Sequence, residues 1–196
     1  WAPHGSRAPP PPGAAWLSGS SKAAGFAVVI RVFPSALPAG QPQWVSLFAV
    51  LSALTMILGN VVALTQRNIK RMLAYSSIGH AGYLLMGVAV ANVVGISSVM
   101  FYLAGYMVTN LAAFGVVVLA SRAIPDDTIE GYSGLHRRSP VLALILAISL
   151  LSLAGLPPMV GFFAKFYLFA AAFQAGLVWL VLVGLLTSAI SLFYYV

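Results

Sequence analysis

Three ionisable side chains, Lys22, His80 and Lys165, lie within long apolar runs of the sequence. If these runs cross a membrane, each group is expensive: a charged side chain at the bilayer centre costs about 2.5–3.5 kcal/mol to insert, and such residues normally face a protein interior or a wet cavity. An imidazole can take up and release protons near neutral pH, and a buried lysine can act as a base. Together the three residues predict an ion pathway inside a membrane.

Lys22 follows a stretch of small residues, Ser18-Gly19-Ser20-Ser21, with roughly ten residues of the same run on either side. Snorkelling to the membrane surface over that distance is not expected, because only the ends of a span allow it. Small neighbours permit close helix packing and leave hydroxyls for hydrogen bonds. The alternative is a structural lysine that is hydrogen-bonded between helices.

His80 lies ten residues after Lys70, which marks the start of its run. A helix rises about 1.5 Å per residue, so the imidazole is expected about 15 Å deeper, near the middle of the membrane. Ser76 and Ser77 come one helical turn earlier, on the same face. The alternative is a core histidine with satisfied hydrogen bonds and no part in transport.

Lys165 follows an interrupted apolar stretch, GLPPMVGFFAKFYLF, at 155–169. The run 140–171 would measure about 48 Å as one helix, against a hydrocarbon core of about 30 Å. Pro157 and Pro158 lack amide donors and clash with the preceding turn, which predicts a break near 155–161 and returns Lys165 to the membrane interior. Broken helices beside ionisable residues are typical of ion-coupled transporters. The alternative is a packing kink with the lysine snorkelling outward.

The composition indicates an integral membrane protein. Hydrophobic residues make up 61% of the chain and charged residues only 7%, whereas soluble domains carry about 25% charge. There are no cysteines for disulfides or thiolate metal sites, and the histidines are scattered. No nucleotide-binding, nucleophile or metal motif is present. The net charge of +7 comes mainly from arginines and lysines in loops between apolar runs, which favours a role in membrane orientation over nucleic-acid binding.

Six apolar runs predict an all-α bundle of about six transmembrane helices, since each run has about the 20 residues that a span needs. The predicted spans are 14–33, 44–64, 72–93, 98–120, 140–171 (broken near Pro157-Pro158) and 175–196. Residues 1–13 form an irregular N-terminal segment in this interpretation, and the whole chain is one membrane domain cut from a longer subunit. Aromatic stretches such as MFYLAGY and FYY are interpreted as packing or lipid contacts.

Positive charge separates the two ends of this bundle. Arginines and lysines concentrate in the loops 65–71 and 122–138, whereas the predicted loops 34–43, 94–97 and 172–174 carry none. Arg31, at the end of a span, is the exception and can snorkel. By the positive-inside rule, the loops 65–71 and 122–138 are predicted to be cytoplasmic.

Four stretches carry a resemblance to a known family. The sequence is similar to the subunit N family of bacterial proton-translocating NADH-quinone oxidoreductase (complex I), whose members are antiporter-like subunits of the membrane arm. The resemblance covers nearly all of residues 14–196 and corresponds to the eighth to thirteenth helices of that family. It is carried by SKAAGFAVVIRVF (21–33), GNVVALTQRNIKRMLAYSSIGHAGYLLMG (59–87), YLAGYMVTNLAAFGVV (102–117) and LSLAGLPPMVGFFAKFYLF (151–169).

This resemblance implies a function for each ionisable position. Lys22 and Lys165 match the lysines of the family's eighth and broken twelfth helices, and His80 matches a polar position between them. Protons would move along this relay, coupled to quinone reduction elsewhere in the complex. NADH, FMN, iron–sulfur clusters and quinone would belong to other subunits. The implied partners are other membrane-arm subunits, the lipid bilayer and internal water, and the implied location is the bacterial inner membrane.

The N-terminal residues depart from the family pattern. The family reads approximately WAPDVYEGAPTPVTAFLS where this chain has WAPHGSRAPPPPGAAWLS. A local frameshift between about residues 4 and 14 is our hypothesis, which resequencing of the source DNA would test. Arg7, which precedes the first span on the same side as the two charged loops, then carries no weight in the prediction of orientation. Two other functions stay open: a subunit of a cation/proton antiporter or other secondary transporter, and a structural membrane spacer.

Overall fold

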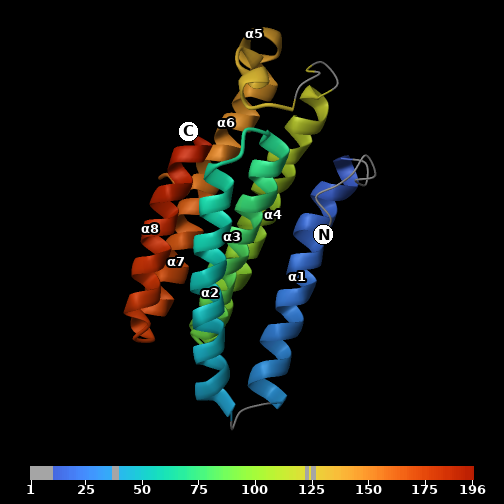
Figure 1. The fold of residues 1–196 in the computed structure, drawn as a ribbon. Helices are drawn as coiled ribbons and strands as arrows, with labels where there is room; N and C mark the ends of the chain where they lie inside the picture. The colour runs from blue at the N-terminus through green and yellow to red at the C-terminus, as the bar shows by residue number, and fades with distance from the viewer. Residues whose placement is uncertain (1–10, 37–39, 122–123, 125–126) are drawn as a thin grey trace.

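The computed structural model describes residues 11–36, 40–121, 124 and 127–196, with side chains described from residue 21 onward except at 34–36. Within these ranges the chain is helical, which confirms the predicted all-α fold (Figure 1). A short 3-10 turn spans Glu130–Tyr132. The helices are α1 (Pro11–Ala36), α2 (Gln41–Leu64), α3 (Ile69–Ala89), α4 (Val93–Ala120), α5 (Leu135–Arg138), α6 (Pro140–Ala154), α7 (Val160–Gln174) and α8 (Val178–Tyr195).

Every predicted span contains a helix, but several predicted ends were wrong. The structure places the turn between α3 and α4 at 90–92 rather than 94–97, because the Asn92 side chain caps α4 by accepting from Gly95 N at 2.8 Å. The last turn lies at 175–177 rather than 172–174, where Gly176 takes a positive φ of 80°. Residues 11–13 are helical, not irregular, and residues 1–10 lie outside the described residues.

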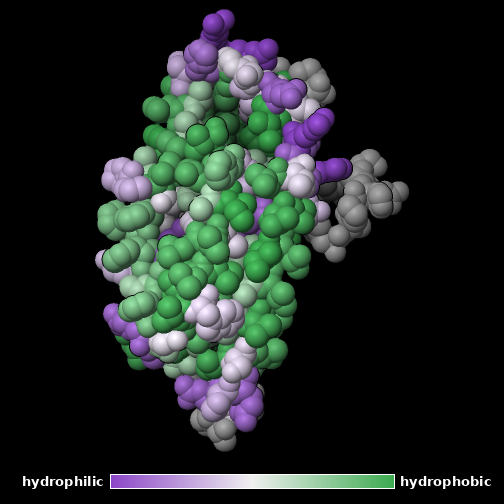
Figure 2. All heavy atoms as spheres, turned by 60° about the vertical axis from the view of Figure 1, so that its left-hand side comes forward, coloured by the Kyte–Doolittle hydropathy of each residue, from purple (hydrophilic) through white to green (hydrophobic). Residues whose placement is uncertain are grey.

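The surface of the bundle fits a membrane environment. Three helices, α2, α4 and α8, are long and apolar enough to cross a membrane among the residues described, and α6 and α7 are shorter apolar helices. On the face seen in Figure 2, hydrophobic residues cover most of the middle of the molecule, and hydrophilic residues gather mainly at the two ends. Together α6 and α7 run in sequence from one end of the bundle to the other (Figure 1).

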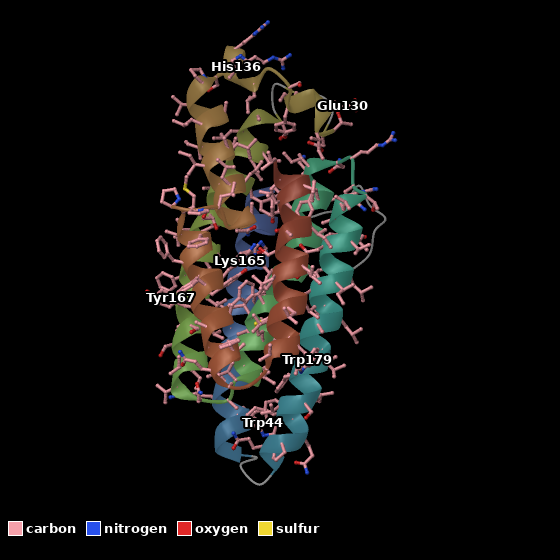
Figure 3. The ribbon with its side chains drawn as sticks, turned by 90° about the vertical axis from the view of Figure 1, so that its left-hand side faces the viewer. Trp44, Glu130, His136, Lys165, Tyr167 and Trp179 are labelled. Atoms are coloured by element: carbon pink, nitrogen blue, oxygen red, sulfur yellow. The ribbon has the colours of Figure 1, made fainter. Side chains whose placement is uncertain are left out.

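The two charged loops meet at one end of the bundle. Asn68, the N-cap of α3, forms an isolated antiparallel bridge with Thr128 of the α4–α5 connection. Beside this bridge, Lys70 Nζ lies 2.7 Å from a carboxylate oxygen of Asp127, with both side chains about one third exposed. Figure 3 shows Glu130 and His136 at this end and Trp44 near the other. The loops 65–71 and 122–138 therefore lie at the same end of the bundle.

Helix α3 lies at the centre of the bundle, where it contacts α1, α2, α4, α7 and α8. Its closest packing is on α2, because a Cβ atom on Gly59 of α2 would collide with the backbone of Gly79 in α3. One turn further along, Ser52 Oγ donates to Gly82 O at 2.7 Å. Small residues at such a seam let helices approach closely inside a membrane. This packing fixes the direction in which α3 presents His80.

Candidate functional site

The candidate site lies at a break between α6 and α7, which the proline pair predicts. Helix α6 ends at Ala154, and Gly155 adopts the left-handed conformation (φ 86°) that favours glycine at a helix C-terminus. A Cβ atom at Gly155 would also lie 2.9 Å from Lys165 Cδ. Position 155 therefore requires glycine for two reasons: the backbone conformation, and the space that the lysine side chain occupies.

The first turn of α7 packs directly on the end of α6. The amide of Gly161 donates to Ser152 Oγ at 3.2 Å, which satisfies one of the donors that a helix N-terminus leaves free. A side chain at Gly161 would collide with the carbonyl oxygen of Ser152. The two half-helices therefore stay in contact, although the residues between them are not helical.

Lys165 points into the bundle from α7 and is only 4% exposed (Figure 3). Its Nζ donates to Ala154 O at 2.8 Å and to Ser188 Oγ of α8 at 3.0 Å. It also lies 5.2 Å from the centroid of the Tyr83 ring. Because α6 ends at Ala154, its carbonyl has no partner in the next helical turn and is free to accept from the lysine. The alternative of a lysine that snorkels outward is wrong.

His80 is buried on α3, at 5% exposure, and both of its ring nitrogens have a tyrosine hydroxyl as neighbour. Nδ1 lies 2.6 Å from the Tyr102 hydroxyl of α4, and Nε2 lies 3.2 Å from the Tyr195 hydroxyl of α8. The imidazole also packs on the Tyr106 ring, with 4.9 Å between centroids. Three helices thus meet at this one side chain.

Lys22 reaches the same cluster from α1, where it is half-buried. Its Nζ donates to the carbonyl and hydroxyl oxygens of Ser77 on α3, and lies 3.5 Å from the Tyr106 hydroxyl. It also sits 5.3 Å from the centroid of the Tyr106 ring. Tyr106 therefore contacts both Lys22 and His80, and Ser77, expected beside the histidine, binds the lysine.

His80 and Lys165 line the same small cavity, which has a volume of about 10 Å³. That is about the space one water molecule occupies, and a water needs two to four polar partners. The lining supplies such groups on both sides. It consists of His80, Tyr102, Gly105, Tyr106, Thr109, Ser152, Leu153, Gly161, Ala164 and Lys165. The structure thus brings all three predicted residues into one buried cluster, linked by tyrosines and this cavity.

The tyrosines of this cluster were not identified from the sequence. The interpretation of MFYLAGY and FYY as packing or lipid contacts holds for Tyr102, Tyr106 and Tyr195 only as packing, because all three are buried in the core. It missed that their hydroxyls lie beside the ionisable residues. It fits their neighbours Phe101 and Phe193, which are exposed on the outside of the bundle. One pattern could have revealed the first two tyrosines: a spacing of four residues places them on one helix face.

The side chains gathered here suit proton transfer between hydroxyl, imidazole and ammonium groups. Across the part of the chain that the structure describes, no group of three or more His, Asp or Glu side chains could hold a metal ion. No buried side-chain nitrogen or oxygen in the same part lacks a hydrogen-bond partner.

Comparisons with known proteins agree on the family. A family model described as NADH:quinone oxidoreductase/Mrp antiporter, TM matches residues 1–191. The chain is 51% identical over 196 residues to NAD(P)H-quinone oxidoreductase subunit 2 of Thermosynechococcus vestitus, and covers 38% of that protein. It is 46% identical over 196 residues to NADH-quinone oxidoreductase subunit N of Heliobacterium modesticaldum, and covers 42% of it.

Solved structures share the fold. A structure of respiratory complex I from Thermus thermophilus with bound aureothin matches 95% of this chain and 40% of that one, with a TM-score of 0.76 and 37% identity. The Mrp complex from Dietzia sp. matches 95% of this chain and 35% of that one, with a TM-score of 0.86 and 28% identity. The chain spans about two fifths of the length of the curated relatives it matches. It belongs to the NADH:quinone oxidoreductase/Mrp antiporter transmembrane family.

Proposed function

We propose that this chain forms part of a proton-translocating membrane-arm subunit of NADH-quinone oxidoreductase. Protons move through Lys22, His80 and Lys165, driven by quinone reduction in other subunits. The observation that carries this proposal is the continuous buried cluster of these side chains: Lys22 and His80 share Tyr106, and His80 and Lys165 line one cavity. The subunit names of the relatives support it.

The geometry suggests how a proton would pass. From Lys22 it reaches His80 past the Tyr106 hydroxyl, and from His80 it reaches Lys165 through a water in the intervening cavity. Like charges repel more strongly in a low-dielectric interior than in water. A proton arriving on one of the three groups therefore favours release from the next.

This chain would carry no redox chemistry of its own. In this proposal NADH, FMN, iron–sulfur clusters and quinone bind to other subunits, and the partners of the chain are other membrane-arm subunits, membrane lipid and internal water. The subunit lies in the bacterial inner membrane. Its apolar band and multi-pass helices support a membrane location, and its relatives' names support assembly in an oxidoreductase complex.

A cation/proton antiporter subunit is the second candidate. The TM-score of 0.86 with the Mrp complex favours it, because this exceeds the 0.76 found with complex I. Sequence identity favours the oxidoreductase, at 51% against 28% for the Mrp chain. Genes for other oxidoreductase subunits beside the source gene would support the first candidate, and an antiporter operon would support the second. A structural spacer gains nothing from buried cations that cost about 2.5–3.5 kcal/mol each to insert.

His80→Gln in the full-length subunit should lower the proton pumping rate per assembled complex about tenfold, which corresponds to about 1.4 kcal/mol of barrier. Glutamine keeps a donor and an acceptor for the tyrosine hydroxyls but cannot carry a proton. Pumping would be measured in inverted membrane vesicles by quenching of a pH-sensitive dye.

His136→Gln is the matched control, because His136 is exposed on α5 at the charged end of the bundle. It should pump at the wild-type rate. If His80→Gln pumps normally and the amount of assembled complex is unchanged, His80 is not part of the relay.

We further infer that the loops 65–71 and 122–138 face the cytoplasm, because their positive charge follows the positive-inside rule. Single cysteines at Arg71 and Glu130, both exposed, should react with a membrane-impermeant maleimide only from the cytoplasmic side. A cysteine at Gln174, exposed at the opposite end, should react only from the other side. Reaction of the first two from outside would invert the orientation.

A further inference from the structure

We propose that Tyr102 and Tyr195 are positioning residues that hold the His80 imidazole at both ring nitrogens, so that it changes protonation state in place. This inference rests on the proposed function, since it assigns a mechanism to the histidine of the relay. It adds two residues from helices α4 and α8 that carry none of the three ionisable groups.

The two hydroxyls approach His80 from opposite edges of the ring. Tyr102 lies 2.6 Å from Nδ1, and Tyr195 lies 3.2 Å from Nε2. The rings of Tyr83 and Tyr106 also pack on the imidazole, with centroid distances of 6.0 Å and 4.9 Å. Rotation of the imidazole would break both hydrogen bonds and displace these contacts. The ring is therefore fixed by four aromatic side chains from three helices.

The chemistry of a hydroxyl explains why tyrosines suit this task. A neutral imidazole has one N–H donor and one acceptor nitrogen, in either of two tautomers, whereas the imidazolium has two donors. A tyrosine hydroxyl can donate or accept, so a pair of them satisfies both tautomers and the cation. A backbone carbonyl could only accept, and an ammonium could only donate. When a proton arrives at one nitrogen, the hydroxyl beside it changes from donor to acceptor, and no other group has to move.

The two tyrosines differ in what lies beyond them. Tyr102 binds His80 Nδ1 and also lines the water-sized cavity together with Lys165. Tyr195 is absent from the cavity lining, and its ring packs on Tyr194 with 4.5 Å between centroids. We therefore expect loss of the Tyr102 hydroxyl to have the larger effect on transport.

Tyr102→Phe and Tyr195→Phe test this assignment in the full-length subunit of the complete complex. Each variant leaves one ring nitrogen without a partner. An orphaned buried N–H is rarer in proteins than an under-satisfied acceptor, so the ring should place its proton toward the remaining hydroxyl. Tyr102→Phe should populate the Nε2–H tautomer, and Tyr195→Phe the Nδ1–H tautomer. Nitrogen-15 solid-state NMR of histidine-labelled complex measures both, with the His80 signal assigned by its loss in His80→Gln.

Proton pumping should fall together with the tautomer change, about tenfold in Tyr102→Phe, a barrier change of about 1.4 kcal/mol, and less in Tyr195→Phe. Tyr167→Phe is the matched control: Tyr167 is 51% exposed at the outer edge of the bundle (Figure 3) and should change neither readout. Unchanged tautomers and pumping in both test variants, with His80→Gln inactive, would overturn the positioning role and leave the relay intact.

Two other results are equally decisive. If His80→Gln pumps normally, the proposed relay itself fails, whatever the tyrosine variants do. Phenylalanine keeps the ring and nearly all the volume of tyrosine, so the complex should assemble. Loss of assembled complex in the two test variants would give the hydroxyls a folding role and would also overturn the positioning assignment.

Discussion

Replacing Lys165 with methionine in the full-length subunit should lower the proton pumping rate per assembled complex at least about tenfold, a barrier change of about 1.4 kcal/mol or more. The lysine is 4% exposed, and its Nζ is held by the carbonyl that the end of α6 frees and by Ser188. Non-helical backbone at membrane depth is tolerated only against protein or a wet cavity. Lys165 binds that backbone through Ala154 O and lines the neighbouring cavity together with His80.

The amount of assembled complex distinguishes a role of Lys165 in proton transport from a role in stability. Inserting a charge at the bilayer centre costs about 2.5–3.5 kcal/mol, so methionine, of similar length and apolar, should not hinder insertion of α7. The amount of assembled complex should therefore stay at the wild-type level while pumping falls. Ser188→Ala is a milder control that removes one acceptor and keeps the ammonium. Full pumping by the methionine variant would show that Lys165 does not carry protons and only packs against the break.

The sequence was sufficient for the fold and for the ionisable residues. Apolar run length gave the helices, and the proline pair with its glycines gave the break between Ala154 and Val160. Helix ends were predicted wrongly where a side-chain hydrogen bond sets them. Asn92 caps α4, so the helix begins at Val93, whereas the apolar run predicted a start at residue 98. Run length averages over many residues, whereas a cap depends on one hydrogen bond. The prediction could therefore locate a helix more reliably than its first residue.

The partners of the ionisable residues could not be predicted in the same way. Tyr195 is separated from His80 by 115 positions in the chain, and Lys165 from Ser188 by 23. Which face of α8 turns inward depends on the packing of α8 against α2, α3, α6 and α7. A tyrosine in an apolar run is equally suited to the membrane interface and to a buried hydrogen bond. From the sequence alone, the tyrosines were therefore interpreted only as packing or lipid contacts.

Lys22 should fail to support proton pumping both as Lys22→Met and as Lys22→Arg, each with a loss of about tenfold, or about 1.4 kcal/mol of barrier. Methionine removes the proton-carrying group. Arginine keeps the positive charge and can still donate to Ser77 and approach the Tyr106 ring, but a guanidinium does not lose its proton in proteins. A relay needs a group that releases a proton and regains it, so retaining the charge is not enough. The proton pumping rate in inverted vesicles, normalised to the amount of assembled complex, measures both variants.

The same substitution at a surface lysine provides the control. Lys70 pairs with Asp127 at 2.7 Å, about one third exposed, and such surface pairs contribute about 0–1 kcal/mol to stability. Lys70→Arg should therefore pump normally. If Lys22 were a fixed structural charge that holds α1 against α3, its arginine variant would work and its methionine variant would fail. If the chain were a membrane spacer, both would work. Only a residue that gives up its proton during transport predicts that arginine and methionine fail alike.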